Sequence, residues 1–408
     1  MHTKRYTLNN YCTTFLWVLW FSVLAMSASA QKSKKVGLYI EQGEAEWEIQ
    51  NYTEAVIWFA KAIEIDSACG EAYFKRAKSF LLNQQVVEAK KDLLKADSLH
   101  YEHIEKKFYW GIILFEENKH EEALSNFENA IKEGYESDIL YSYMAESYKE
   151  LKNKKQALFY YQKAIALSPK TSYLYWLRGN FYYQHQDFDL ALQDLDKVTQ
   201  LSKRHWEAYK LKADIYFRTN KDALSIENRL KYIQYNPSKN KIVANDYSLL
   251  AYSYAQTKQL KNALIYIQKA IDLDKENPEY FFEQANYYIL LKSYLKALES
   301  SQKAIEFDGF DLSYFRQRAF LLRQLKKYQE ALQDYVFLAQ QDEQDAENHY
   351  FVGEMKYHLK TPSKEFQKDI QTAFQLGYPK EKMLPELQKY AERKLTMPRF
   401  LKRKITKT

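Results

Sequence analysis

The sequence predicts an all-α solenoid of about ten antiparallel helix pairs, and two series of small residues carry this prediction. The first series recurs every 34 residues, apart from one interval of 38: Gly43, Ala77, Gly111, Ala145, Gly179, Ala213, Ala251, Ala285, Ala319 and Gly353. The second follows twelve positions behind: Ala55, Ala89, Ala123, Ala157, Ala191, Ser225, Ala263, Ala297 and Ala331. Self-similarity at a fixed period of this length is typical of stacked structural repeats.

The content of one repeat explains why each unit is a helix pair. Residues 138–148 place their apolar side chains at the spacing of one helix face. The polar segment 149–155 predicts a turn, and a second apolar stripe covers 157–165 before Pro169, which cannot continue a helix. Small residues fit where the two helices cross, because a larger side chain there would hold the backbones apart. The low content of 9 Gly and 7 Pro in 408 residues agrees with an all-helical array.

Aromatic residues repeat in register with the small ones. Four places before the small residue stand Tyr39, Tyr73, Tyr141, Tyr175, Tyr209, Tyr247, Phe281 and Phe315. Three places after it stand Phe80, Tyr148, Tyr182, Tyr216, Tyr254 and Tyr288. From about Val36 to Gly377, the pattern resembles the tetratricopeptide repeat family. The resemblance implies a right-handed superhelix, in which the first helices line a concave face that takes an extended peptide or a partner helix.

Departures from the pattern divide the chain. The predicted organisation is a signal peptide at 1–30, repeat units one to six at 31–237, an insertion and hinge at 238–243, units seven to ten at 244–379, a capping helix at 380–396 and a basic tail at 397–408. The hinge is placed where the interval lengthens, in the unit that carries Ser225, Arg229 and Tyr232 instead of Ala, an aromatic and Ala. In the tenth unit, Pro362 indicates a second helix about one residue out of register.

The first thirty residues read as a secretory signal peptide. Lys4 and Arg5 precede an apolar run over 15–26, and small residues at 28–30 suit cleavage before Gln31. We therefore expect export to the periplasm or the cell exterior, with a bacterial host preferred; an uncleaved signal anchor is the alternative. After cleavage only Cys69 remains, so no intramolecular disulfide forms. Cys69 lies at the seam between two units, where either simple packing or an intermolecular bridge would use it.

The charge is unevenly distributed. The chain has 60 Lys and Arg against 53 Asp and Glu, with two of the cations in residues 1–30 and five in the tail, so residues 31–396 are balanced. The tail cations are Arg399, Lys402, Arg403, Lys404 and Lys407. A balanced array argues against nucleic acid as a partner, since nucleic-acid-binding domains are strongly basic. The tail is either a solvated end or a contact with an acidic membrane surface or acidic partner.

No motif of an enzyme is present in the sequence. The eight histidines are scattered, and none has the His-Glu-x-x-His spacing of a zinc hydrolase or a cysteine partner. There is no Gly-rich phosphate loop and no Gly-x-Ser-x-Gly elbow. We therefore expect no catalysis, no cofactor and no metal.

The resemblance places the groove on the first helices. Carried over position by position, it implies a lining of Phe74, Phe108, Phe115, Tyr173, Trp176, Asn180, Tyr183, Lys210, Phe217, Tyr252, Phe282, Asn286, Arg316 and Phe320. Trp176 and Phe282 would be anchors, since aromatic residues dominate binding energy at interfaces, and Asn180 and Asn286 would hydrogen-bond a peptide backbone. The alternative is that neighbouring repeats bury these aromatics. A clamp of Lys with Asn four residues later, which some members use for a C-terminal carboxylate, is absent because Lys210 is followed by Asp214.

Two functions remain open at this stage. The first is an exported, non-catalytic scaffold or adaptor that binds a peptide or partner helix in its groove, within an envelope or secretion assembly. The second is a structural subunit that docks to a membrane or a larger complex through its terminal helix and basic tail, with the groove unused.

Overall fold

The computed structural model describes residues 30–238 and 243–392, and over these residues it is helical without a strand. The chain divides into two compact units, Met1–Leu201 and Ser202–Thr408, which are described separately below. The predicted hinge at 238–243 lies almost entirely outside the described residues and stays a prediction. The helices on either side of it pack together within the second unit.

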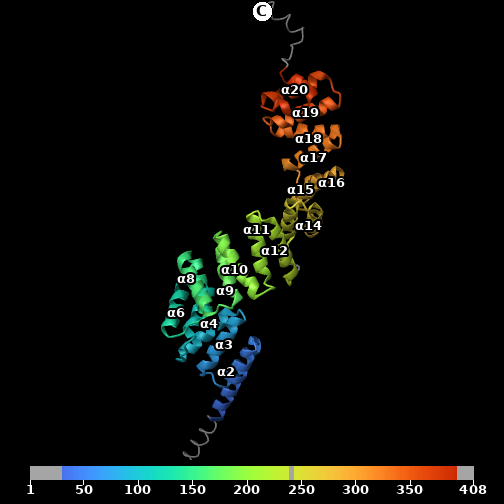
Figure 1. Ribbon diagram of the computed structural model, residues 1–408. Coiled ribbons are helices and arrows are strands. Elements are labelled where there is room, and N and C mark those ends of the chain that lie inside the picture. The colour runs from blue at the N-terminus through green and yellow to red at the C-terminus, as the bar shows by residue number, and fades with distance from the viewer. Residues whose placement is uncertain (1–29, 239–242, 393–408) are drawn as a thin grey trace, which may run out of the picture. The chain divides into compact units, whose positions relative to one another are not determined.

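The first unit is a row of helices packed in consecutive pairs (Figure 1). It contains a helix at 30–48, α2 (Tyr52–Ile65), α3 (Gly70–Leu82), α4 (Val86–Ser98), α5 (Lys106–Glu116), α6 (His120–Lys132), α7 (Asp138–Glu150), α8 (Lys154–Leu167), α9 (Ser172–Gln184) and α10 (Phe188–Leu201). The odd-numbered helices from α3 onward are the first helices of their repeats and the even-numbered ones are the second.

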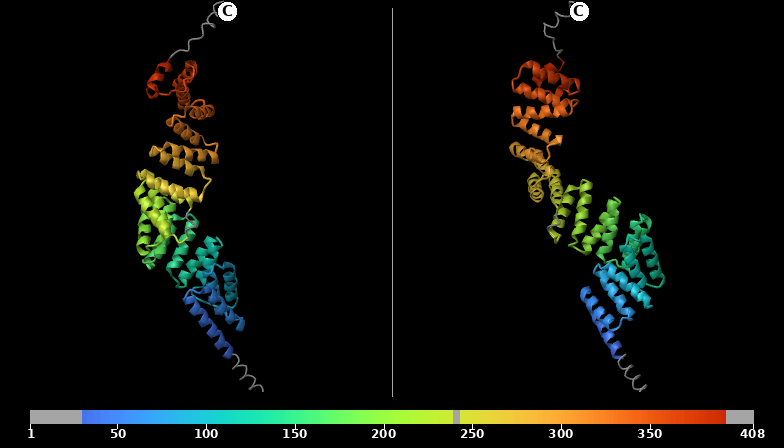
Figure 2. Two further views of the ribbon diagram at one scale, coloured as in Figure 1. Left: turned by 90° about the vertical axis from the view of Figure 1, so that its right-hand side faces the viewer. Right: turned by 180° about the vertical axis from the view of Figure 1, so that it is seen from behind.

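The second unit continues the same alternation, and two further views show each helix beside the next in chain order (Figure 2). It contains α11 (Trp206–Arg218), α12 (Asp222–Tyr235), α13 (Ala244–Gln256), α14 (Leu260–Leu273), α15 (Pro278–Leu290), α16 (Tyr294–Phe307), α17 (Leu312–Gln324), α18 (Tyr328–Gln341), α19 (Ala346–His358), α20 (Ser363–Gln375), the 3-10 helix η2 (Lys380–Lys382) and α21 (Pro385–Ala391). The predicted all-α array of helix pairs is confirmed.

The small residues of both series occupy the crossings between paired helices. All ten members of the first series are buried, and the alanines of the second are fully buried. At Gly43, a methyl group would come within 2.5 Å of the Phe59 ring on the paired helix. The small residue therefore sets how closely the two helices of a repeat approach.

Each repeat turns from its first to its second helix through one residue with left-handed backbone. These residues have φ between +54° and +63°, and none is glycine: Gln50, Gln84, Asn118, Lys152, Gln186, Asn220, Lys258, Lys292, Lys326 and Lys360. A positive φ is costly for a residue with a Cβ, so the packing of the helix pair must stabilise the turn.

Three repeats add a partly buried ion pair between their two helices. Each pair joins an arginine just before the small residue to an aspartate sixteen residues later through two hydrogen bonds of 2.6–2.8 Å: Arg76–Asp92, Arg178–Asp194 and Arg318–Asp334. The aspartates are 5% exposed. Bidentate geometry of this kind is strong and directional, so the pairs hold the register of first helix against second.

The sixth repeat replaces its missing alanines with a buried polar cluster. Arg229, which is fully buried, donates to Asp214 at 2.6 Å and to Asp246 at 3.2 Å. The Tyr232 hydroxyl also donates to Asp246, at 3.0 Å, and the Ser225 hydroxyl donates to the Ala213 carbonyl at 3.2 Å. The unusual residues of this repeat are thus accounted for by a network that ties α11, α12 and α13 together.

The C-terminal end differs from the expected single capping helix at 380–396. The chain forms η2 and then the short helix α21, because Pro385 takes the first position of a helix and cannot lie inside one. Met383, Leu387 and Ala391 are nevertheless buried with residues of α19 and α20, so the segment still covers the last repeat. As expected, α20 begins one residue later than the period of the earlier second helices.

Cys69 is half-buried at the seam between α2 and α3, and burial raises the pKa of its thiol. Across residues 30–238 and 243–392, no helix is long and apolar enough to cross a membrane. The predicted signal peptide, apart from Ala30, and the basic tail both lie outside the described residues.

Candidate binding grooves

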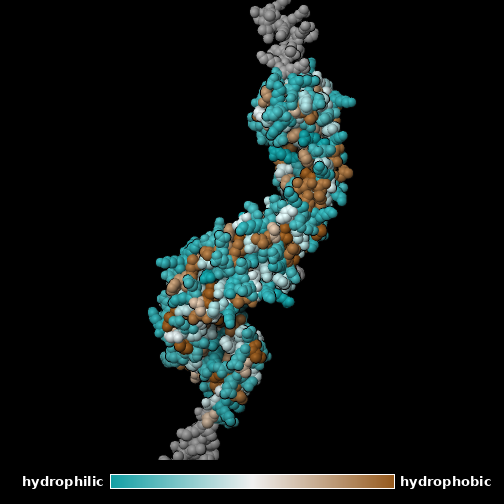
Figure 3. Space-filling view, in the orientation of Figure 1, coloured by the Kyte–Doolittle hydropathy of each residue, from teal (hydrophilic) through white to brown (hydrophobic). Residues whose placement is uncertain are grey.

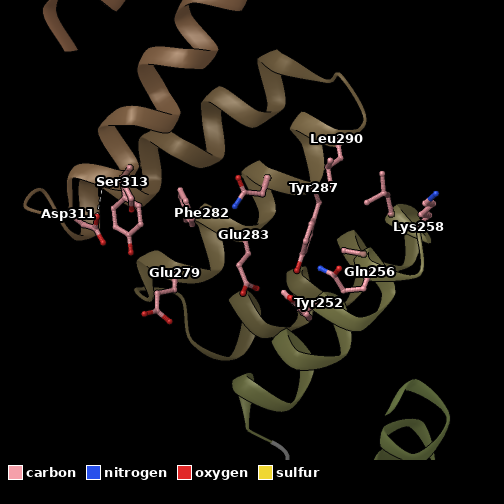
Figure 4. Close-up of a pocket in the computed structure, with 14 residues that line it drawn as sticks. Tyr252, Gln256, Lys258, Glu279, Phe282, Glu283, Tyr287, Leu290, Asp311 and Ser313 are labelled. Carbon is pink, nitrogen blue, oxygen red and sulfur yellow. Dashed lines mark hydrogen bonds between the residues drawn. The ribbon is translucent and has the colours of Figure 1, made fainter. Parts of the chain in front are cut away.

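A groove of about 850 Å³ lies across three successive first helices of the second unit, α13, α15 and α17 (Figure 4). We call it the α15 groove. It is lined by Tyr252, Ala255, Gln256, Lys258, Leu260, Glu279, Phe282, Glu283, Asn286, Tyr287, Leu290, Asp311, Ser313 and Tyr314. Half of the lining residues are aromatic or aliphatic, and the other half are acidic residues, amides, one serine and one lysine.

Helix α15 supplies two parallel rows to this groove. Residues four apart lie on one face of a helix, one turn above the other. One row is Phe282, Asn286 and Leu290, and the other is Glu279, Glu283 and Tyr287. A bound segment would therefore meet an apolar row and a polar row side by side.

The polar row contains a half-buried carboxylate. Burial raises the pKa of Glu283, while a hydrogen bond of 3.0 Å donated by the Ser248 hydroxyl opposes that rise. Tyr287 is only 5% exposed, and its hydroxyl lies against the Glu283 carboxylate, with no other hydrogen-bond partner among the described residues. Burial and the nearby charge of Glu283 raise the pKa of Tyr287.

An amide network supports the apolar row from α17. The Gln317 amide donates to the Phe282 carbonyl at 3.1 Å and to the Asn286 side-chain oxygen at 2.8 Å. The side-chain oxygen of Asn286 accepts this hydrogen bond from Gln317, which fixes the orientation of the Asn286 amide. The Phe282 ring packs on Tyr314, with centroids 5.2 Å apart.

A second groove, of about 690 Å³, lies across α5, α7 and α9 in the first unit; we call it the α9 groove. Its rim includes Tyr173 and Trp176, whose rings stack with centroids 5.9 Å apart. Glu146, one of the three carboxylates in its lining, pairs with Lys149 and accepts a hydrogen bond from the Tyr161 hydroxyl.

The structure brings together part of the predicted groove lining. Tyr252, Phe282 and Asn286 meet in the α15 groove. The α9 groove contains Phe115, Tyr173, Trp176 and Asn180. Tyr173 is 54% exposed and Tyr252 is 42% exposed, so neighbouring repeats do not bury them.

Two predicted groove residues belong to the core instead. Phe74 is 1% exposed and packs on Tyr101 and His103. Phe108 is 3% exposed and packs on Tyr135. These two aromatics are therefore buried, which is the alternative given above. The segment between one repeat and the next covers each ring, and comparison with the family's groove positions alone does not predict that cover.

The remaining predicted residues lie outside both grooves. Tyr183 packs on Phe188, and Phe217 packs edge-on against Tyr252 with centroids 5.5 Å apart. The Lys210 ammonium lies 4.0 Å from the Asp246 carboxylate, and the Arg316 guanidinium donates a hydrogen bond of 2.9 Å to the Asp345 carboxylate. Phe320 is half-buried beside the core of the last repeats. Arg399, Lys402, Arg403, Lys404 and Lys407 are not among the described residues, and no metal-binding cluster occurs in the part that is described.

Sequence reasoning missed the polar row of the α15 groove. It followed the face that contains Phe282 and Asn286 and omitted Glu279, Glu283 and Tyr287. The signal was present, because these three residues are themselves spaced by four. Extending the lining to the adjacent row would have found them.

Comparison with known proteins agrees with this architecture. Residues 36–69, 139–171 and 247–277 match models of the tetratricopeptide repeat. No protein with a curated description matches the chain.

Similar solved structures are distant in sequence. One is pilF of Pseudomonas aeruginosa, with 18% identity and a TM-score of 0.43 over 51% of this chain and 95% of that chain. Another is YrrB, described as a TPR protein with an unusual peptide-binding site, with 23% identity and a TM-score of 0.35 over 44% and 93%. A third is the C-terminal part of a TPR repeat-containing protein from Cytophaga hutchinsonii, with 16% identity and a TM-score of 0.39 over 68% and 98%.

Proposed function

The chain is a member of the tetratricopeptide repeat family, and from that premise we propose that it is a non-catalytic scaffold that binds a segment of a partner protein in the α15 groove. The observation that carries the proposal is the convergence of Tyr252, Phe282 and Tyr287 from two successive first helices on one open groove. Aromatic anchors in such grooves supply most of the binding energy at protein interfaces.

The α9 groove is a second candidate surface on the same scaffold. Tyr173 and Trp176 present a stacked pair of rings at its rim. Because the two grooves belong to separate units, we treat their binding as independent.

Export is part of the proposal and rests on residues 1–30. The chain would then act in the periplasm or outside the cell, as an adaptor in an envelope or secretion assembly. Mass spectrometry of the native protein tests this point, with a mature N-terminus expected at Gln31 and an intact N-terminus arguing for a retained anchor.

Site-specific photo-crosslinking tests the groove. A photoreactive residue placed at the exposed position Tyr252 is expected to capture a partner in cells, and Phe282→Ala is expected to reduce the yield at least about tenfold. Trp176→Ala tests the α9 groove in the same way, with the photoreactive residue at Tyr173.

Phe159→Ala is the matched control, because Phe159 is a 50% exposed aromatic on a second helix outside both grooves. If the crosslinking yield at Tyr252 is the same for Phe282→Ala as for Phe159→Ala, binding in the α15 groove is refuted.

A further inference from the structure

The α15 groove holds a carboxylate without a counter-ion. Glu283 is half-buried, and it forms no ion pair with any residue in the described ranges; its polar contacts there are with two neutral hydroxyls, those of Ser248 and Tyr287. Glu279 lies one turn earlier on the same row and is exposed without an ion pair to a described residue. Lys258 also lines the groove, but Figure 4 shows it at one end, with Tyr287 between it and Glu283. The polar row is therefore negative and uncompensated.

A second observation points to a ligand at the same place. The Tyr287 hydroxyl is buried against the Glu283 carboxylate and has no other hydrogen-bond partner among the described residues, so its oxygen is left without a donor. Figure 4 shows the side chains of Glu283 and Tyr287 extending from neighbouring turns of α15 toward the side where Tyr252 lies. A hydroxyl oxygen and a carboxylate placed together can both accept hydrogen bonds from one donor group.

The α9 groove provides an internal contrast. Glu146, one of its three carboxylates, is neutralised by Lys149 and accepts a hydrogen bond from the Tyr161 hydroxyl. Glu283 contacts the neutral hydroxyls of Ser248 and Tyr287, but no cation pairs with it among the described residues.

Apolar surface adjoins the negative row. Leu290 lines the groove and is 62% exposed, and Leu291 and Leu295 beside it are 39% and 64% exposed. Figure 3 shows hydrophobic surface over the region of α15 and α16. Phe282 adds an aromatic face to the same groove.

We propose that the segment bound in the α15 groove carries a lysine or arginine beside a large apolar residue, and that Glu283 and Tyr287 receive the cation while Phe282 and Leu290 receive the apolar side chain. This inference rests on the proposed function, since it specifies the partner for the same groove. A cationic donor would neutralise the half-buried carboxylate through a charge-assisted hydrogen bond, and the aromatic walls would favour it through cation–π attraction. The occupant is a segment of a separate protein.

Peptide selection tests the proposal. A phage library of random twelve-residue peptides is selected on the purified protein, and each selected peptide is then measured by fluorescence anisotropy on the wild type, Phe282→Ala, Glu283→Gln and Glu276→Gln. The last variant removes an exposed carboxylate outside the groove and controls for the change in net charge.

Peptides that require Phe282 are expected to contain Lys or Arg next to a large apolar residue. They should bind Glu283→Gln at least about tenfold more weakly and Glu276→Gln unchanged. Replacing the peptide cation with glutamine should weaken binding by the same factor, and the two changes together should cost no more than either alone, since both remove one interaction.

The other outcomes separate the two proposals. Phe282-dependent peptides that lack a cation, or that bind Glu283→Gln as well as the wild type, would overturn this inference and leave groove binding intact. If no selected peptide depends on Phe282, groove binding itself fails. Tighter peptide binding after removal of residues 397–408 would identify the chain's own basic tail as the occupant and overturn the assignment to a separate partner.

Discussion

Arg229 and Glu283 are charged residues of the same unit that differ in whether a residue of opposite charge lies beside them. Arg229 is fully buried, but Asp214 and Asp246 neutralise it, so its charge serves the packing of α11, α12 and α13. The same contact explains why Asp214 stands where a carboxylate-clamp asparagine would be needed. Glu283 is half-buried and has no cation beside it among the described residues, and we propose that a bound segment supplies one.

The pH dependence of stability tests this view of Glu283. Because burial raises its pKa above the ordinary value of 4.5, the folded protein holds the proton more tightly than the unfolded chain does. The contribution of Glu283 to stability is therefore favourable at low pH and is lost as pH rises through the raised pKa. Glu283→Gln is expected to melt at a higher temperature than the wild type at pH 7.

The difference in melting temperature between Glu283→Gln and the wild type should shrink as the pH is lowered to about 4. Calorimetry at both pH values measures it, with Glu276→Gln as the exposed control. If Glu283→Gln is more stable than the wild type at neutral pH but binds basic peptides more weakly, Glu283 serves binding at a cost in stability. Such a trade-off between function and stability is common. A melting temperature below that of the wild type at pH 7 would contradict this prediction.

At the scale of the helix pair, the small residues and the rings opposite them set the spacing. Gly111 faces the Phe127 ring so closely that an added methyl group would overlap it, and Phe127 is fully buried and cannot move aside. At Gly37, on the helix at 30–48, an added methyl group would meet no other atom within 4 Å.

Gly111→Ala and Gly37→Ala therefore form a matched pair. Both gain helix propensity of about 1 kcal/mol, but only Gly111→Ala overpacks a core, which costs about 1–3 kcal/mol. We expect Gly37→Ala to be neutral or stabilising and the free energy of unfolding of the two variants to differ by about 1–3 kcal/mol. Urea denaturation followed by circular dichroism measures both, and equal stabilities would show that the crossing can widen freely.

At the scale of the whole molecule, stability and charge are distributed differently. Each repeat contacts mainly its neighbours, so stability is a sum of local terms along the array. The net charge is not shared in this way, since residues 31–396 are balanced and the excess lies in the tail at 397–408. The rival function, docking through the tail to an acidic membrane or complex, follows from that segregation.

Deletion of residues 397–408 distinguishes the rival from the groove. If the tail docks the protein, the truncated chain should move from the membrane or complex fraction to the soluble fraction, and added salt should release the full chain likewise, because exposed charges are screened. Phe282→Ala, which leaves the tail intact, should not change fractionation. Unchanged fractionation of the truncated chain would show that the tail does no docking.

The fold was largely predictable because its determinants are local and repeated. A residue such as Ala145 or Ala157 must be small wherever two helices cross, so the period alone locates the pairs. The grooves were only partly predictable. Phe74 and Tyr252 come from first-helix positions of the same repeat family, yet the former is covered by its inter-repeat segment and the latter is open.

The sequence by itself determined the helix pairs, their period and the register of their contacts, because each depends on residues within one repeat or its neighbour. Only the tertiary structure decided which aromatics remain exposed, which carboxylates have a counter-ion, and that Glu283 and Tyr287 line the same groove as Phe282. Exposure and ion pairing depend on where side chains of different helices meet in space. That meeting follows from the packing of successive helices rather than from the spacing within any one of them.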